Sequence, residues 1–253
     1  MKHYIFSLAS VLLATGGFAQ MDTRDASSQA IADNFATFSS VQANGQAAST
    51  GTTILAFNHK EETKGSPYLF NRWVKGTAIN SSNATVDQKG YLYNYDKLNH
   101  TLLLNVEGKY MVNVSNEDVK SFTLQGGDDG EMTFERINDV VIDGSPFFQV
   151  LVKGDAGKYS LYKMTRTKFV KADYHTDGMV ESGNPYDQYV DTDDYFLLMP
   201  DGKTLKLMPM KVKTMKETVA VGNQKMLDFL KEHRYDSVDA AFLKQMTLYI
   251  NAN

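Results

Sequence analysis

The sequence predicts a mainly β protein: an antiparallel meander forming a sandwich or barrel-like sheet, with a short N-terminal helix and a C-terminal αα-hairpin. Three observations predict this class. Apolar residues alternate with period two in many short segments after residue 53. Turn residues recur about every 8 to 12 residues. Apolar residues in 210–253 change to helical spacing.

Residues 1–19 have the pattern of a signal peptide. Lys2 gives a basic start, an apolar run follows from Tyr4 to Ala14, and Gly17 and Ala19 are the small residues that a signal peptidase reads. The run is too short to span a bilayer. We therefore expect export to the periplasm or the cell exterior, a mature chain that starts at Gln20, and no membrane span in that chain.

The chain contains no cysteine, which excludes disulfides, thiolate metal sites and cysteine nucleophiles. An exported chain of this size without cysteine is more typical of bacteria than of an animal secretory pathway. Cleavage after residue 19 removes one lysine, so that 26 basic and 30 acidic residues become 25 and 30, a net charge of −5. A nucleic-acid-binding surface would need a basic face, so nucleic acid is not expected as a partner.

Residues 20–52 are predicted to form a short helix and a flexible linker. Ile31, Phe35 and Phe38 follow helical spacing, whereas 41–52 is small, polar and without periodicity. The predicted β domain spans 53–209, and its first strand is Thr53–Phe57.

Residues 90–124 read as four successive strands of one meander, with a tight turn at Glu107-Gly108. Tyr91, Tyr93 and Tyr95 fall on one face of the first of these strands. Together with Trp73 they are candidate ligand-binding residues, because an exposed aromatic platform can stack on sugar rings or apolar side chains. The alternative places the rings in the core, and the preference of tyrosine for half-buried strands favours it.

A resemblance follows from these residues. Ser66-Pro67, Trp73, Gly76 and the strand Tyr93-Asn94-Tyr95-Asp96 resemble a group of exported bacterial β-rich proteins classed as a domain of unknown function. The resemblance covers the β part and the helical end. It implies no activity, and no catalytic residue is carried over from it.

Further strands are predicted near 132–137, 147–152 and 159–164, followed by a hairpin over 195–207 that turns at Pro200-Asp201-Gly202. The segment 210–253 is predicted to be helical. One helix spans Asn223–His233, and a last helix is capped by Asp236 or Ser237. We expect this αα-hairpin to cover a sheet face or to dock a partner.

Residues 172–194 interrupt the pattern and are predicted to form a long acidic loop. Asp173, His175 and Asp177, followed by Gly178, resemble the start of a calcium loop, and Glu181 is a further candidate ligand. The spacing is incomplete, because His175 stands where an oxygen is wanted. The alternative is a solvated loop whose aromatic residues lie on the sheet.

The chain has no G-x-S-x-G, H-E-x-x-H or dinucleotide-binding motif, and we assign no catalytic residue. The sequence favours an exported, non-catalytic binding or structural module whose partner is an envelope protein or a glycan. Two alternatives stay open. One is a hydrolase that acts on an extracellular polymer with carboxylates of 172–194, and the other is a structural calcium-binding protein.

Overall fold

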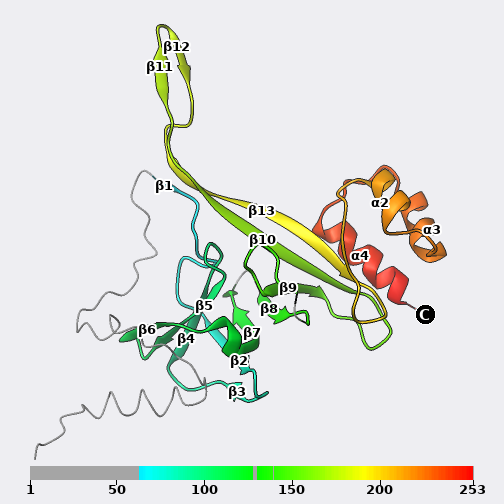
Figure 1. Ribbon diagram of the computed structural model, residues 1–253, viewed down its shortest axis with the longest axis horizontal. Coiled ribbons are helices and arrows are strands. Elements are labelled where there is room, and N and C mark those ends of the chain that lie inside the picture. Colours follow the sequence, from blue (N-terminus) through cyan, green and yellow to red (C-terminus); the bar gives the residue numbers. More distant parts are fainter. Residues whose placement is uncertain (1–62, 128–129, 139, 253) are drawn as a thin grey trace, which may run out of the picture. The chain divides into compact units, whose positions relative to one another are not determined.

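The computed structural model describes residues 63–127, 130–138 and 140–252 (Figure 1). Of the described residues, 43% are in strands and 17% in helices, so the prediction of a mainly β class is confirmed. The sheets formed by these residues are not closed, so the barrel-like alternative is not what this part of the chain forms. The predicted N-terminal helix, the linker 41–52 and the strand Thr53–Phe57 lie outside the described residues.

In the described part of the chain, the larger sheet has nine strands in the order β1-β13-β10-β9-β8-β7-β2-β3, and β14 also pairs with β13. β1 runs parallel to β13, and the other neighbours are antiparallel. The strands are β1 (Thr63–Lys64), β2 (Lys75–Asn80), β3 (Thr85–Val86), β7 (Val119–Gln125), β8 (Glu131–Arg136), β9 (Phe147–Val152), β10 (Ser160–Val170), β13 (Asp187–Leu198) and β14 (Leu205–Leu207).

The second sheet contains β4 (Tyr91–Asp96), β5 (Thr101–Val106) and β6 (Tyr110–Asn113). The prediction of a single four-strand meander is therefore wrong at its last strand. A short 3-10 helix, η1 (Asn116–Asp118), leads the chain into β7, which pairs with β2 and β8 of the larger sheet. The period-two pattern is the same whichever sheet a strand joins, so it cannot reveal this change.

Aromatic rings fill the space where the two sheets face each other. The ring of Tyr95 lies 5.4 Å from that of Phe122 and 5.3 Å from that of Phe134, centroid to centroid, and Phe122 stacks on Phe134 at 4.9 Å. Phe147 meets Phe122 edge to face. All four residues are buried. These rings therefore pack the second sheet against β7, β8 and β9 of the larger sheet.

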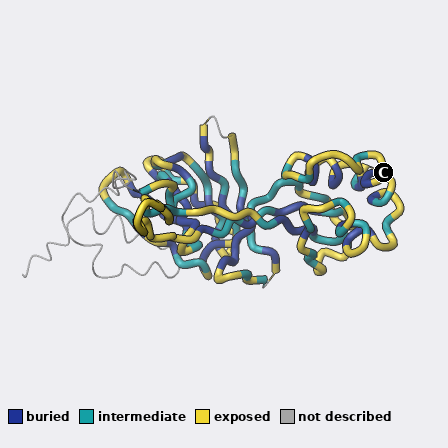
Figure 2. The backbone as a smooth tube through the Cα atoms, turned by 90° about the horizontal axis from the view of Figure 1, so that it is seen from above, coloured by how far each residue is buried: buried dark blue, intermediate teal, exposed yellow. Residues whose placement is uncertain are grey.

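Three helices follow the strands in the described residues: α2 (Val212–Thr218), α3 (Gln224–Glu232) and α4 (Ala240–Asn251). α4 contacts β9, β10 and α3. Buried side chains of these helices and strands form one apolar cluster, which includes Leu161, Leu197, Met226 and Leu243. Figure 2 shows buried positions both among the strands and among the C-terminal helices.

The caps of α3 and α4 are side chains that accept backbone N–H bonds, as expected for helix starts. Asn223 accepts from Met226 N, and Asp239 accepts from Phe242 N at 2.8 Å. The predicted cap Asp236 or Ser237 is wrong, because the Asp236 carboxylate instead contacts His233 in the turn between the two helices.

Candidate functional site: a projecting β hairpin

β10 and β13 form a hairpin that pairs without interruption from Ser160↔Leu198 to Val170↔Gln188. Only Leu161 to Lys163 of β10 also pair with β9. Beyond them the hairpin continues as a ribbon of two long strands, which β1 joins beside Asp187 and Gln188 (Figure 1). It ends in a second hairpin made of β11 (His175–Asp177) and β12 (Val180–Ser182). We call residues 164–194 the arm and residues 171–187 its tip.

The prediction that residues 172–194 form a loop is therefore wrong. They contain β11, β12 and the first part of β13. A hydrophobic period arises where one face of a strand is buried, but β11 and β12 are exposed at every position and so are residues 190–193 of β13. The paired strands consequently carry no apolar alternation for sequence reasoning to detect.

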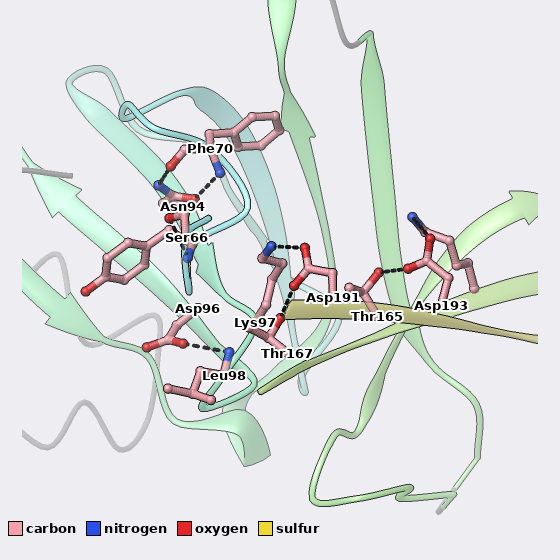
Figure 3. A network of polar contacts seen from close by, with 12 residues as sticks. Ser66, Phe70, Asn94, Asp96, Lys97, Leu98, Thr165, Thr167, Asp191 and Asp193 are labelled. Carbon is pink, nitrogen blue, oxygen red and sulfur yellow. Dashed lines mark hydrogen bonds and ion pairs between the residues drawn. The ribbon is translucent and has the colours of Figure 1, made fainter. Parts of the chain in front are cut away.

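Two carboxylates of β13 that were predicted to lie in a loop have hydrogen-bond partners directly across the ribbon. Asp191 Oδ1 accepts a bond from Thr167 Oγ1 at 2.6 Å, and Asp193 Oδ1 accepts one from Thr165 Oγ1 at 2.6 Å (Figure 3). Both pairs are opposite each other in the strand register. Hydrogen bonds to a charged acceptor are stronger than neutral ones, so these pairs stabilise the arm where it has little apolar packing.

Lys97 joins the arm to the second sheet. This lysine is only 8% exposed, and its ammonium group forms an ion pair with Asp191 (Figure 3). It lies in the turn after β4, which the Asp96 carboxylate shapes by accepting bonds from the N–H groups of Leu98 and Asn99, both at 2.9 Å. A buried ammonium group without a partner would be costly, so the pair holds the base of the arm in place.

The aromatic residues that the sequence suggested for ligand stacking do not form an exposed platform. Tyr91, Tyr93 and Tyr95 are 6%, 0% and 5% exposed, and Trp73 is half-buried. The Tyr93 hydroxyl donates to Val86 O at 3.1 Å. Burial raises the pKa of Tyr95 to about 12. The rings therefore belong to the interior, as the core interpretation expected.

The candidate calcium ligands lie near one another in sequence but are divided between two faces. His175 and Asp177 share one face of the β11–β12 ribbon, whereas Glu181, opposite Thr176, lies on the other. Both His175 ring nitrogens are in contact, Nδ1 with Asp173 O and Nε2 with Ser182 Oγ, each at 2.9 Å.

No group of three or more His, Cys, Asp or Glu side chains that could hold a metal ion occurs among the described residues. Calcium binding stays a prediction from the sequence.

The tip presents apolar side chains to solvent. Gly178, with φ of 65°, and Met179 form a two-residue turn between β11 and β12, with the glycine first, as in type II′ hairpins. Met179 is completely exposed, and Val180 is 65% exposed. Neither residue was predicted from the sequence to be part of a site. The Asp177-Gly178 pair, a recognised hairpin signal, could have indicated the turn.

These features define the class of the protein: a mainly β chain with two facing sheets, a helical end and an arm with an exposed tip. Comparison with protein-family models, with curated proteins and with solved structures finds no match to the chain. The resemblance to exported bacterial proteins of unknown function therefore stays a prediction. None of the described helices is long and apolar enough to cross a membrane.

Proposed function

We propose that this chain is an exported, non-catalytic binding module that engages a protein of the cell envelope through the tip of its arm. The observation that carries the proposal is the complete exposure of Met179 at the end of a ribbon held by polar pairs. An unbranched, polarisable methionine side chain adapts to irregular apolar pockets and is frequent on binding surfaces.

The charge of the tip indicates the chemistry of the partner. Between residues 171 and 187, four carboxylates stand against Lys171 as the one cation, which leaves a net charge of −3 with His175 neutral. We infer a partner with an apolar pocket that is rimmed by lysine or arginine, since complementary charge speeds association and selects the partner. The ion pair between Lys97 and Asp191 supports binding through the arm. An arm that is already held in place loses less conformational entropy when a partner binds.

A photo-crosslinking amino acid at position 179 of the full chain, made in its own cells, tests the proposal. We expect one adduct of defined mass. The matched control carries the same crosslinker at Val221, which is 68% exposed in the turn after α2, and should give none. An equal adduct at both positions, or none at position 179, would contradict the proposal.

A charge test separates a specific partner from a general affinity for apolar side chains. The double variant Asp177→Lys/Glu181→Lys should remove the adduct at position 179, because it reverses the charge beside the methionine. The control Asp155→Lys/Glu217→Lys changes the net charge of the chain equally at exposed positions outside the arm and should leave the adduct unchanged.

Export is the second part of the proposal, and residues 1–19 support it. In a bacterial host, we expect the wild-type chain outside the cytoplasm with a mass that starts at Gln20. The variant Ala19→Arg, which changes the residue before the cleavage point, should keep the mass of the precursor. A wild-type chain recovered uncleaved in the cytoplasm would refute export.

A further inference from the structure

A groove of about 620 Å³ lies where β2 changes its neighbour on the edge that does not pair with β7, and Gln125 at the end of β7 also lines it. Along that edge, Ala78 pairs with Val86 of β3, whereas Val74 pairs with Tyr93 of β4. Gly76 stands between these two pairs. The chain from 87 to 90 spans the gap and forms one wall.

Gly76 lets β2 lie close to β7 and to the Tyr93 ring beside the groove, and it supplies polar backbone to the groove. A Cβ atom at this position would lie 2.5 Å from Thr123 O and 3.2 Å from the Tyr93 ring, so a larger residue would displace the strand. Val74 directs its N–H and C=O toward β4. Since these groups alternate in direction along a strand, Gly76 directs its own to the same side, into the groove.

Tyr91 reaches this groove from the second sheet. Tyr91 lies on the same face of β4 as Tyr93 and lines the groove. It is 6% exposed, and its hydroxyl oxygen is buried with no hydrogen-bond partner among the described residues. Burial first, and then the charge of Glu107, raise the pKa of Tyr91, so the hydroxyl keeps its proton and can donate it. Buried hydroxyls in folded proteins nearly always have a partner.

The other lining groups determine what kind of ligand fits. Lys75 and Lys89 are balanced by Asp87 and Glu107, so the groove offers no excess of charge to a phosphate or to a polycation. Carboxylates, ammonium groups, the Tyr91 hydroxyl and backbone amides together offer both donors and acceptors. A ligand with many neutral hydroxyl groups on a compact ring can form hydrogen bonds with both the donors and the acceptors of this groove. The volume is typical of sites for drug-sized ligands, which corresponds to a disaccharide or trisaccharide.

We propose that this groove binds a neutral saccharide and that the Tyr91 hydroxyl donates a hydrogen bond to it. The site is separate from the arm, so it does not depend on the proposed function. A carbohydrate bound here and a protein bound at the tip would be two independent ligands of one exported chain.

The test uses the mature chain on an array of neutral oligosaccharides of glucose, galactose, mannose and N-acetylglucosamine. The best-bound disaccharide or trisaccharide is then titrated by calorimetry. Tyr91→Phe removes only the hydroxyl and should weaken binding about fivefold to tenfold, the effect of one lost hydrogen bond. Tyr95→Phe, the same change on the same strand outside the groove, should leave the affinity unchanged.

A chain without its tip, in which Lys171–Asp187 is replaced by Asn-Gly, should bind the saccharide as the wild type does. This result separates the groove from the arm. Gln125→Ala, at the rim of the groove, gives a second variant in case Tyr91→Phe does not fold. No binding up to about 10 mM, binding of charged oligosaccharides only, or equal affinities of the Tyr91 and Tyr95 variants would overturn the proposal.

Discussion

Phe122 lies at the centre of the aromatic cluster between the two sheets. It is 1% exposed and contacts the rings of Tyr95, Phe134 and Phe147. Phe122→Ala should lower the free energy of unfolding by about 3–5 kcal/mol, because it removes a large buried ring and leaves a cavity. Urea denaturation measures the change. Phe169→Ala, on the arm and 47% exposed, is the control and should cost much less. Equal losses would show that the cluster is not the core of this region.

His100 gives the protein a pH dependence of known sign. It has a φ of 54°, and burial lowers its pKa from 6.5, although Asp96 and Asp143 act in the opposite direction. Well above pH 6.5 the imidazole is neutral in both states and contributes nothing. As the pH falls below about 6.5, the unfolded chain takes up the proton first, so the folded state loses stability.

The wild type should therefore lose more stability between pH 7 and pH 5 than His100→Asn does, since asparagine tolerates a positive φ and does not titrate in this range. Urea denaturation of both chains at the two pH values measures the difference. Identical pH dependence of the two chains would contradict it.

At the scale of elements, the ion pair between Lys97 and Asp191 connects the arm to the second sheet. The side chain of Lys97 is 10% exposed and that of Asp191 is 44% exposed, so solvent partly screens the pair. A double-mutant cycle with Lys97→Met and Asp191→Asn should give a coupling energy of about 1 kcal/mol, between the values for exposed and buried pairs. In Asp191→Asn the amide oxygen can still accept the hydrogen bond from Thr167, so this substitution removes the charge and keeps that bond.

Hydrogen exchange gives a local measure of the same connection. In Lys97→Met, exchange of the backbone amides near 189–193 should become faster, while exchange in β7 should stay as it is in the wild type. Additive effects of the two substitutions, together with unchanged exchange in the arm, would show that the arm does not need this pair.

At the scale of the whole molecule, stability and binding are assigned to different parts. Two apolar clusters formed by described residues of the larger sheet and the helices contain no residue of the tip. Replacing Lys171–Asp187 by Asn-Gly should therefore change the melting temperature by no more than about 3 °C, while the crosslink partner is lost. A chain that ends at Asp239 is the contrasting variant. It lacks Phe242, Leu243, Met246 and Ile250 of the helical cluster and should not fold stably.

Much of the fold could be predicted from short stretches of sequence. Period-two alternation placed β4, β5 and β6, the Glu107-Gly108 turn has the expected positive φ at both residues, and the hairpin at Pro200-Asp201-Gly202 is present as β13 and β14. In that turn, bonds from Thr204 and Lys203 lower the pKa of Asp201 to about 2. Each of these features depends on residues only a few positions apart.

The candidate site could not be predicted in this way. The partners Lys97 and Asp191 are 94 residues apart, and only the folded chain brings them together. The pairing of β7 with the larger sheet and the groove beside Gly76 likewise depend on residues that only the folded chain brings together.

The sequence by itself determined a mainly β class with a helical end, because local spacing and turn chemistry dictate which elements form. The tertiary structure alone decided that the tyrosines of β4 are interior residues and that residues 172–194 belong to an arm. Burial and strand pairing depend on what faces a segment across space. A run of polar residues has the same local pattern in a loop as in a ribbon whose partners come from another strand.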